Sequence, residues 1–275
     1  MQRILSTYRW VGHPLTPALL GEIAKAEIPA VEIFCATGHF PYRSDDAVRD
    51  LGSALSEHRL QLHALHSPTE RDSTSGHQSG VQISISDPER IRRIDSVDEV
   101  KRALEVAERI PFRYLIQHLG SGRQSADPRK LDAAFESLEN LTIFAKHRGV
   151  TIALENKADE LGCPTTLHQF AQKTHLQVKF CFDIGHAHIE GGVGPGFELM
   201  RERVVTVHVH DNHGDKDEHL LPGEGTIDWD EAFAAFRSVP EQPAFVMELK
   251  EKAPGTPKMD EIRAAFDRLE ELSEK

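Results

Sequence analysis

VKFCFD at residues 178–183 and VVTVHVH at residues 204–210 decide the fold class of this chain. Both are short runs of β-branched and aromatic residues, which are typical of buried strands. A segment of helix length separates them, so we expect two parallel strands joined by a crossover helix. This unit predicts an α/β protein.

The same alternation of strand and helix extends along the whole chain. Eight such units close more readily as a (β/α)8 barrel than as an open doubly wound sheet, and no glycine-rich nucleotide fingerprint follows the first strand. A length of 275 residues fits one barrel, so we predict a single TIM barrel domain over residues 1–275. The expected strands, each followed by a helix, are 2–8, 30–34, 60–66, 113–118, 150–155, 178–183, 204–210 and 243–249.

Helix boundaries and one long loop can also be predicted. Ser96 and Glu99 form a capping-box pattern, which predicts a helix over 96–110. The polar stretch 67–95, rich in glycine and serine, predicts an irregular loop that covers the barrel mouth. Further helix starts are expected at Thr16-Pro17, at Asp127-Pro128, and at a second capping-box pattern made by Asp228 and Glu231.

Composition argues against several classes of protein. Hydrophobic residues make up 39% of the chain and charged residues 28%, as in an ordinary globular domain. The first residues lack a signal-peptide pattern and no later run approaches membrane-spanning length, so we expect a cytoplasmic protein without a membrane partner. Acidic residues outnumber basic ones by 44 to 32. This balance disfavours nucleic-acid binding without excluding it, because metal ions or a local basic patch can oppose the net charge.

Six consecutive predicted strands carry a metal-competent side chain at or near the end where barrel enzymes hold their active sites. Any one of these residues is equally well explained as a hydrogen-bonded cap. Burying three carboxylates together, however, costs several kcal/mol per uncompensated ion, and a divalent cation resolves that conflict. The residues are His66, His118, Glu155, Asp183, the pair His208 and His210, and Glu248.

The central ligand set is expected to be Glu155, Asp183, His208 and Glu248. One imidazole with three carboxylates suits manganese, magnesium, iron, cobalt or zinc better than copper(I) or a cluster. His208 and His210 lie two apart on one strand and point to the same side, so either is eligible as the ligand. We favour His208, with His210 behind it.

Loop residues extend the candidate site. His186 follows Asp183 in CFDIGHAH, and Asp217 and His219 flank one residue in DKDEHLLPGEG. An extended backbone aims Asp217 and His219 the same way, as a shared ligand or substrate site requires. The competing interpretation is a solvated polar loop. Lys157 is a further candidate for orienting substrate hydroxyls or a phosphate, with a solvated lysine as the alternative.

In these residues the chain resembles the xylose isomerase-like barrel superfamily. This superfamily contains sugar and sugar phosphate isomerases and epimerases, together with abasic-site nucleases of the endonuclease IV type. The resemblance covers nearly the whole chain. The segments that carry it are LHSP around His66, IQHLGS around His118, ALENK around Glu155, CFDIGHAH around Asp183, VHVHDN around His208, DEHLLPGEGTIDW around His219 and VMELK around Glu248.

The resemblance implies either one metal ion or up to three. In the epimerase branch, the positions matching Glu155, Asp183, His208 and Glu248 bind one metal, and the two glutamates serve as acid and base. In the nuclease branch, these four positions and those matching His66, His118, His186, Asp217 and His219 hold three zinc ions. Leu220 stands where some ketose epimerases carry an arginine, which argues against a ketose 3-epimerase in the narrow sense.

We therefore predict a divalent-metal-dependent isomerase or epimerase, or a related lyase, acting on a sugar or another polyhydroxy carbonyl compound. Glu155 and Glu248 are expected to transfer protons through an enediolate. The alternative is a zinc-dependent endonuclease or phosphodiesterase of the endonuclease IV kind. A third hypothesis is a metal-stabilised binding protein without catalysis. Barrels of this group often associate, so a homo-oligomer is compatible with the sequence.

Overall fold

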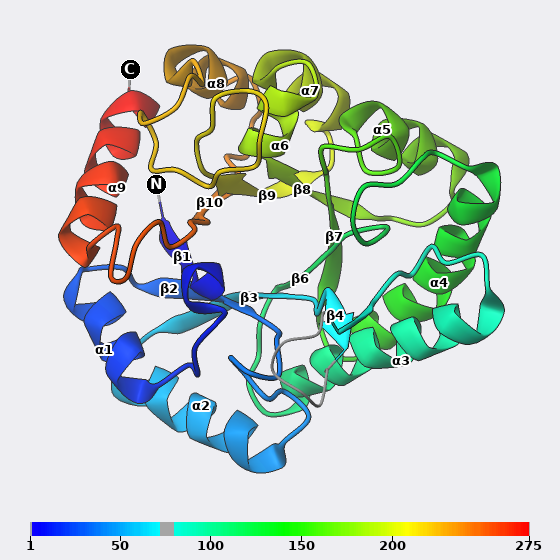
Figure 1. Ribbon diagram of the computed structural model, residues 1–275, viewed down its shortest axis with the longest axis horizontal. Helices are drawn as coiled ribbons and strands as arrows, with labels where there is room; N and C mark the ends of the chain where they lie inside the picture. The colour runs from blue at the N-terminus through cyan, green and yellow to red at the C-terminus, as the bar shows by residue number, and fades with distance from the viewer. Residues whose placement is uncertain (1, 72–79, 275) are drawn as a thin grey trace.

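Eight parallel strands close into a barrel at the centre of the molecule (Figure 1). The structure, a computed structural model, describes residues 2–71 and 80–274. Around the barrel the strands follow the order β1, β10, β9, β8, β7, β6, β3, β2, which confirms the predicted (β/α)8 fold. The strands are β1 (Arg3–Ser6), β2 (Ala30–Phe34), β3 (Gln61–His66), β6 (Tyr114–Gln117), β7 (Thr151–Glu155), β8 (Lys179–Asp183), β9 (Val204–Val209) and β10 (Ala244–Met247).

Helices surround the strands and bury their outward-facing side chains (Figure 1). None of the helices in the described residues is long and apolar enough to cross a membrane. Two short 3-10 helices, η1 (Thr7–Trp10) and η2 (Val106–Glu108), accompany the α-helices. The α-helices are α1 (Pro17–Lys25), α2 (Asp45–Glu57), α3 (Arg90–Glu105), α4 (Pro128–Lys146), α5 (Pro164–Lys173), α6 (Ile184–Ile189), α7 (Val193–Met200), α8 (Trp229–Phe236) and α9 (Met259–Ser273).

Three of the predicted helix starts are confirmed. The side chains of Thr16, Asp127 and Asp228 each accept a hydrogen bond from a backbone N–H in the first turn of α1, α4 and α8. These caps satisfy amide groups that have no partner within the helix.

The predicted start of a helix at Ser96 is wrong. Helix α3 begins at Arg90, and Ser96 lies inside it, where its hydroxyl donates to the carbonyl of Arg92 and accepts from the backbone N–H of Ser84. Glu99 does not cap the helix either, because its carboxylate accepts from the hydroxyl of Tyr42 at 2.6 Å. Both side chains are buried, and tertiary contacts rather than capping account for them.

The stretch 67–95 is only partly irregular. It contains the antiparallel strands β4 (Glu70–Arg71) and β5 (Val81–Gln82), and its last residues belong to α3. Residues 72–79 lie outside the described part of the chain. The idea that this stretch covers the barrel mouth stays a prediction.

Each barrel strand carries two inward-facing layers, two residues apart, because successive side chains alternate across a strand. The lower layer is mainly apolar and forms small clusters separate from the main core: Ile4, Ala30, Ala64, Ile116, Ala153, Cys181 and Val246, with Thr206 on β9. The layer toward the C-terminal end of the strands is polar throughout: Ser6, Glu32, His66, His118, Glu155, Asp183, His208 and Glu248.

Candidate metal centre

Four side chains converge at the centre of the polar layer. Glu155 and Asp183 end β7 and β8, His208 lies on β9, and Glu248 follows β10 directly. One potential ligand atom from each lies within 4.8 Å of those from the other three. The Nδ1 atom of His208 is 3.1 Å from Glu155 Oε1, 3.4 Å from Glu248 Oε2 and 3.8 Å from Asp183 Oδ2. The structure thus brings together the predicted quartet.

The quartet is buried, with at most 4% of any of its residues exposed. Within residues 2–71 and 80–274, every ion-pair partner of Glu155, Asp183 and Glu248 is a histidine. Burial raises the pKa of Glu248, but His208 outweighs it and holds this pKa at about 2. Burial likewise lowers the pKa of His208, and the surrounding carboxylates raise it well above its usual range. Protons on histidine thus supply the positive charge that a divalent cation would supply.

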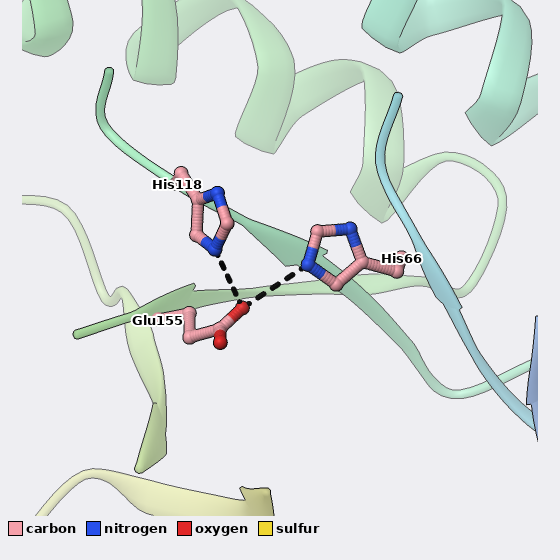
Figure 2. Close-up of side chains that lie close together, drawn as sticks. All are labelled: His66, His118 and Glu155. Carbon is pink, nitrogen blue, oxygen red and sulfur yellow. Dashed lines mark hydrogen bonds and ion pairs between the residues drawn. The ribbon is translucent and has the colours of Figure 1, made fainter. Parts of the chain in front are cut away.

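A second group of ligand-type side chains shares Glu155. Figure 2 shows His66 and His118 pointing at the same oxygen of this carboxylate, Oε2, with their Nε2 atoms at 3.2 Å and 2.9 Å. The Nδ1 atom of His66 lies 2.9 Å from the carbonyl oxygen of Ser67. This carbonyl keeps a proton on Nδ1, so the lone pair of Nε2 is free to bind a metal ion. One potential ligand atom from each of the three residues lies within 4.8 Å of the others.

The predicted loop residues lie on the other side of the quartet. His186 Nδ1 is 3.4 Å from Asp183 Oδ1, and its Nε2 is 3.7 Å from Asp217 Oδ2. His219 Nε2 is 3.0 Å from the same oxygen of Asp217. Burial lowers the pKa of His186, but Asp183 and Asp217 outweigh it and raise this pKa to about 10.

His210 lies against the quartet without completing it. Its Nε2 atom is 3.0 Å from Asp183 Oδ2, and its ring stacks on that of His219 with centroids 4.0 Å apart. With His219 and Glu248 it forms a third group of mutually close ligand atoms. A Cβ on Gly185 would lie 2.0 Å from the His210 ring, so only glycine fits beneath it.

The loop that carries Asp217 and His219 is organised by Asp211, a residue that sequence reasoning missed. The buried Asp211 carboxylate accepts from the indole N–H of Trp229 and from the backbone N–H groups of residues 212, 223 and 227. His219 adopts a left-handed backbone conformation, with φ of 49°. Such a conformation is costly for a residue with a side chain and persists where the surroundings enforce it.

Lys157 is not brought into these groups. Its Nζ donates to the carbonyl of Gly122 at 2.8 Å and lies 3.7 Å from Asp159. A different lysine, Lys250, contacts the candidate site: its Nζ lies 3.2 Å from Asp217 Oδ2. It stands two residues after Glu248 on the same rim, a spacing that was available in the sequence.

Comparison with known proteins identifies the family. Residues 20–272 match the model of the xylose isomerase-like TIM barrel family. The chain belongs to this family. A probable endonuclease 4 of Natronomonas pharaonis is 28% identical over 171 residues, which are 54% of this chain and 60% of that protein.

Solved structures share the fold over nearly the whole chain. A D-tagatose 3-epimerase-like protein superimposes with a TM-score of 0.78 and 23% identity, over 98% of this chain and 99% of that one. The IolI protein with a bound zinc atom gives a TM-score of 0.77 and 17% identity, over 99% of this chain and 98% of that one. At these identities the likeness shows the fold alone.

Proposed function

We propose that this protein is a divalent-metal-dependent isomerase or epimerase, or a related lyase, acting on a sugar or another polyhydroxy carbonyl compound. The observation that carries the proposal is the buried quartet of Glu155, Asp183, His208 and Glu248. A sugar-epimerase-like protein and a zinc-binding protein of the same fold support it.

The donor set fits a metal ion. Asp217 Oδ1 is buried without a hydrogen-bond partner in the described residues, as an unoccupied metal-ligand atom would be. The quartet would hold the ion, and carboxylates with one imidazole suit manganese, magnesium, iron, cobalt or zinc. When bound, the ion would draw electron density from neighbouring carbonyl and hydroxyl oxygens and acidify the adjacent C–H.

Glu155 and Glu248 would move the proton. β8 and β9 separate their strands around the barrel, so the two carboxylates approach the centre from different walls. One carboxylate would take the proton from carbon, and the other would return one to the opposite face of the enediolate. His186 and His219 would orient hydroxyl groups or a phosphate.

Solvent exchange tests this proposal whatever the product is, because the proton on carbon is lost before the product forms. The metal-loaded protein is incubated in D2O with a panel of ketoses and keto-sugar phosphates, and deuterium at the carbon beside the carbonyl is followed by NMR. We expect incorporation with the wild type and its loss in Glu155→Gln and Glu248→Gln, with circular dichroism unchanged. Near wild-type exchange in both variants would refute the acid-base assignment.

A second candidate function rests on a separate observation. His66 and His118 share Glu155, and His186, Asp217 and His219 lie on the other side, so this chain has side chains for more than one ion. Together with the endonuclease-like relative, this favours a phosphodiester hydrolase of the endonuclease IV kind. Zinc ions bound there would supply hydroxide and stabilise the leaving oxygen.

Metal stoichiometry separates the two functions. Protein purified without chelators is analysed for metal per chain and assayed in parallel on ketoses and on an abasic-site duplex. One ion with ketose exchange supports the isomerase, whereas up to three zinc ions with strand cleavage support the hydrolase. Full metal occupancy with neither activity would favour a binding protein without catalysis.

A further inference from the structure

Glu32 is a buried carboxylate that the proposed chemistry does not use. It lies on β2, in the polar layer of the barrel, and is fully buried. Its two oxygens are both 3.2 Å from Nε2 of His208. Within the described residues its carboxylate has no other ion-pair or hydrogen-bond partner, and Oε1 has no hydrogen bond.

The His208 ring separates Glu32 from the quartet. Nδ1 faces Glu155 and Glu248, and Nε2, across the ring, faces Glu32. Glu32 is therefore not placed as a ligand. An imidazole whose Nε2 carries the proton and donates it to Glu32 has its Nδ1 lone pair free toward the quartet.

Three other histidines of the site are held differently. Their Nδ1 atoms lie next to backbone carbonyl oxygens, and they present Nε2 to the carboxylates. The contacts are His66 to Ser67 at 2.9 Å, His186 to Asn156 at 2.9 Å and His219 to Glu248 at 3.1 Å. His208 differs from these three in the described residues: its Nδ1 has no backbone carbonyl partner, and a side-chain carboxylate, Glu32, lies at its Nε2. A carboxylate accepts a stronger hydrogen bond than a neutral carbonyl does and makes the opposite nitrogen a better donor to a metal.

We propose that Glu32 is a positioning residue that holds the His208 proton on Nε2 and thereby sets the metal affinity of the central quartet. The inference rests on the metal site of the proposed function and adds to it a residue outside the ligand set. Glu99 is also a buried glutamate, but its carboxylate accepts hydrogen bonds from Tyr42 and Arg43 and does not face the quartet.

Cobalt(II) binding tests the inference without an activity assay. Metal-free wild type, Glu32→Gln and Glu99→Gln are titrated with Co²⁺, following the visible absorption bands and the affinity by chelator competition. We expect Glu32→Gln to bind Co²⁺ about 10- to 100-fold more weakly with shifted bands. Glu99→Gln, the matched loss of a buried carboxylate, should keep the wild-type affinity and spectrum.

Wild-type affinity and an unchanged spectrum in Glu32→Gln would overturn the role of Glu32. No Co²⁺ binding by the wild type would instead remove the metal site itself, and the proposed function with it. If Glu32→Gln does not fold, nitrogen-15 NMR of the zinc-loaded wild type decides, with His208→Asn used to assign the signal. A proton on Nε2 of His208 supports the inference, and a proton on Nδ1 overturns it.

Discussion

The two ends of the barrel hold buried histidines whose pKa values are shifted in opposite directions. Strand β3 carries one histidine at each end. His66 ends the strand and points at Glu155. Burial lowers its pKa, but the hydrogen bond to Glu155 outweighs this and the pKa is raised. His63, three residues earlier, is 2% exposed and its Nε2 has no hydrogen-bond partner in the described residues. Burial and the nearby Arg113 lower its pKa to about 4.

The packing at the two ends differs as well. Beside His63 lies a cavity of about 650 Å³, lined by the first residues of several strands, among them Tyr114, Val204 and Ala244. At the opposite end, the His210 ring packs directly on Gly185. A buried histidine alone is thus no sign of a site. Carboxylates arranged around it are what distinguish the C-terminal end.

The largest effect is expected from removing the carboxylate that two groups share. Glu155→Gln deletes the anionic partner of His66, His118 and His208 at once. We expect ketose exchange to fall about 10²- to 10⁴-fold, as for loss of an acid-base group. Bound metal measured by mass spectrometry should fall with it. Glu99→Gln serves as the control, and metal content equal to wild type in Glu155→Gln would contradict the shared-ligand assignment.

Because the His210 ring packs on Gly185, we expect a side chain at position 185 to lower the free energy of unfolding. A Cβ in Gly185→Ala would overlap the His210 ring, and overpacking of this kind costs about 3 kcal/mol. Urea denaturation measures the loss. Gly12→Ala is the control, because nothing lies within 4 Å of a Cβ at that position. Equal stability of the two variants would show that the His210 ring moves aside freely.

Sequence reasoning found the carboxylate-rich end because its residues lie at or near the ends of consecutive predicted strands, and the structure shows that they also share a spacing along each strand. Glu155, Asp183 and His208 each stand two positions after a small or apolar inward residue, and alternation along a strand places them in one layer. Glu32 obeys the same rule after Ala30 and was missed, since a glutamate near the end of a strand is ordinary by itself.

The parts that sequence reasoning got wrong depend on partners distant in the chain. Ser96 has the local pattern of a helix cap, yet its partner is Ser84, in the segment that precedes α3. Asp211 looks like any loop aspartate until residues 223, 227 and 229 are seen to donate to it. Local patterns predict what neighbouring residues do, and these contacts join residues 12 or more positions apart.

The buried imidazole of His63 predicts a pH dependence of stability. The pKa of His63 is about 4 in the folded protein and about 6.5 in the unfolded chain. Between these values the unfolded chain binds more protons, so stability falls as the pH drops from 6.5 toward 4. The wild type should lose about 2 kcal/mol from this residue between pH 7 and pH 5.

His63→Gln should remove that part of the loss. Denaturant unfolding of metal-free protein at both pH values measures it, and His147→Gln, an exposed position, is the control. The same pH dependence in His63→Gln and wild type would show that the imidazole is not held neutral.

The smallest effect is expected from replacing Lys250, whose ammonium group lies against Asp217 at the carboxylate-rich end. Its Nζ is 3.2 Å from Asp217 Oδ2, but 39% of its side chain is exposed, so solvent screens the interaction. Lys250→Met removes a charge that repels a divalent cation and frees Asp217 to bind one. We expect Co²⁺ to bind about 2- to 5-fold more tightly, corresponding to ~0.5–1 kcal/mol.

Lys157→Met is the matched control for Lys250→Met, because Lys157 donates to the carbonyl of Gly122 and its ion-pair partner, Asp159, lies outside the candidate ligand set. Calorimetric titration of both variants at low and at physiological salt separates charge from structure. The gain in Lys250→Met should shrink as salt rises, since screening weakens the repulsion in the wild type. Weaker Co²⁺ binding in Lys250→Met at both salt concentrations would contradict this and mean that Lys250 holds Asp217 in place. The two ends of the barrel would then differ in how their side chains are positioned as well as in charge.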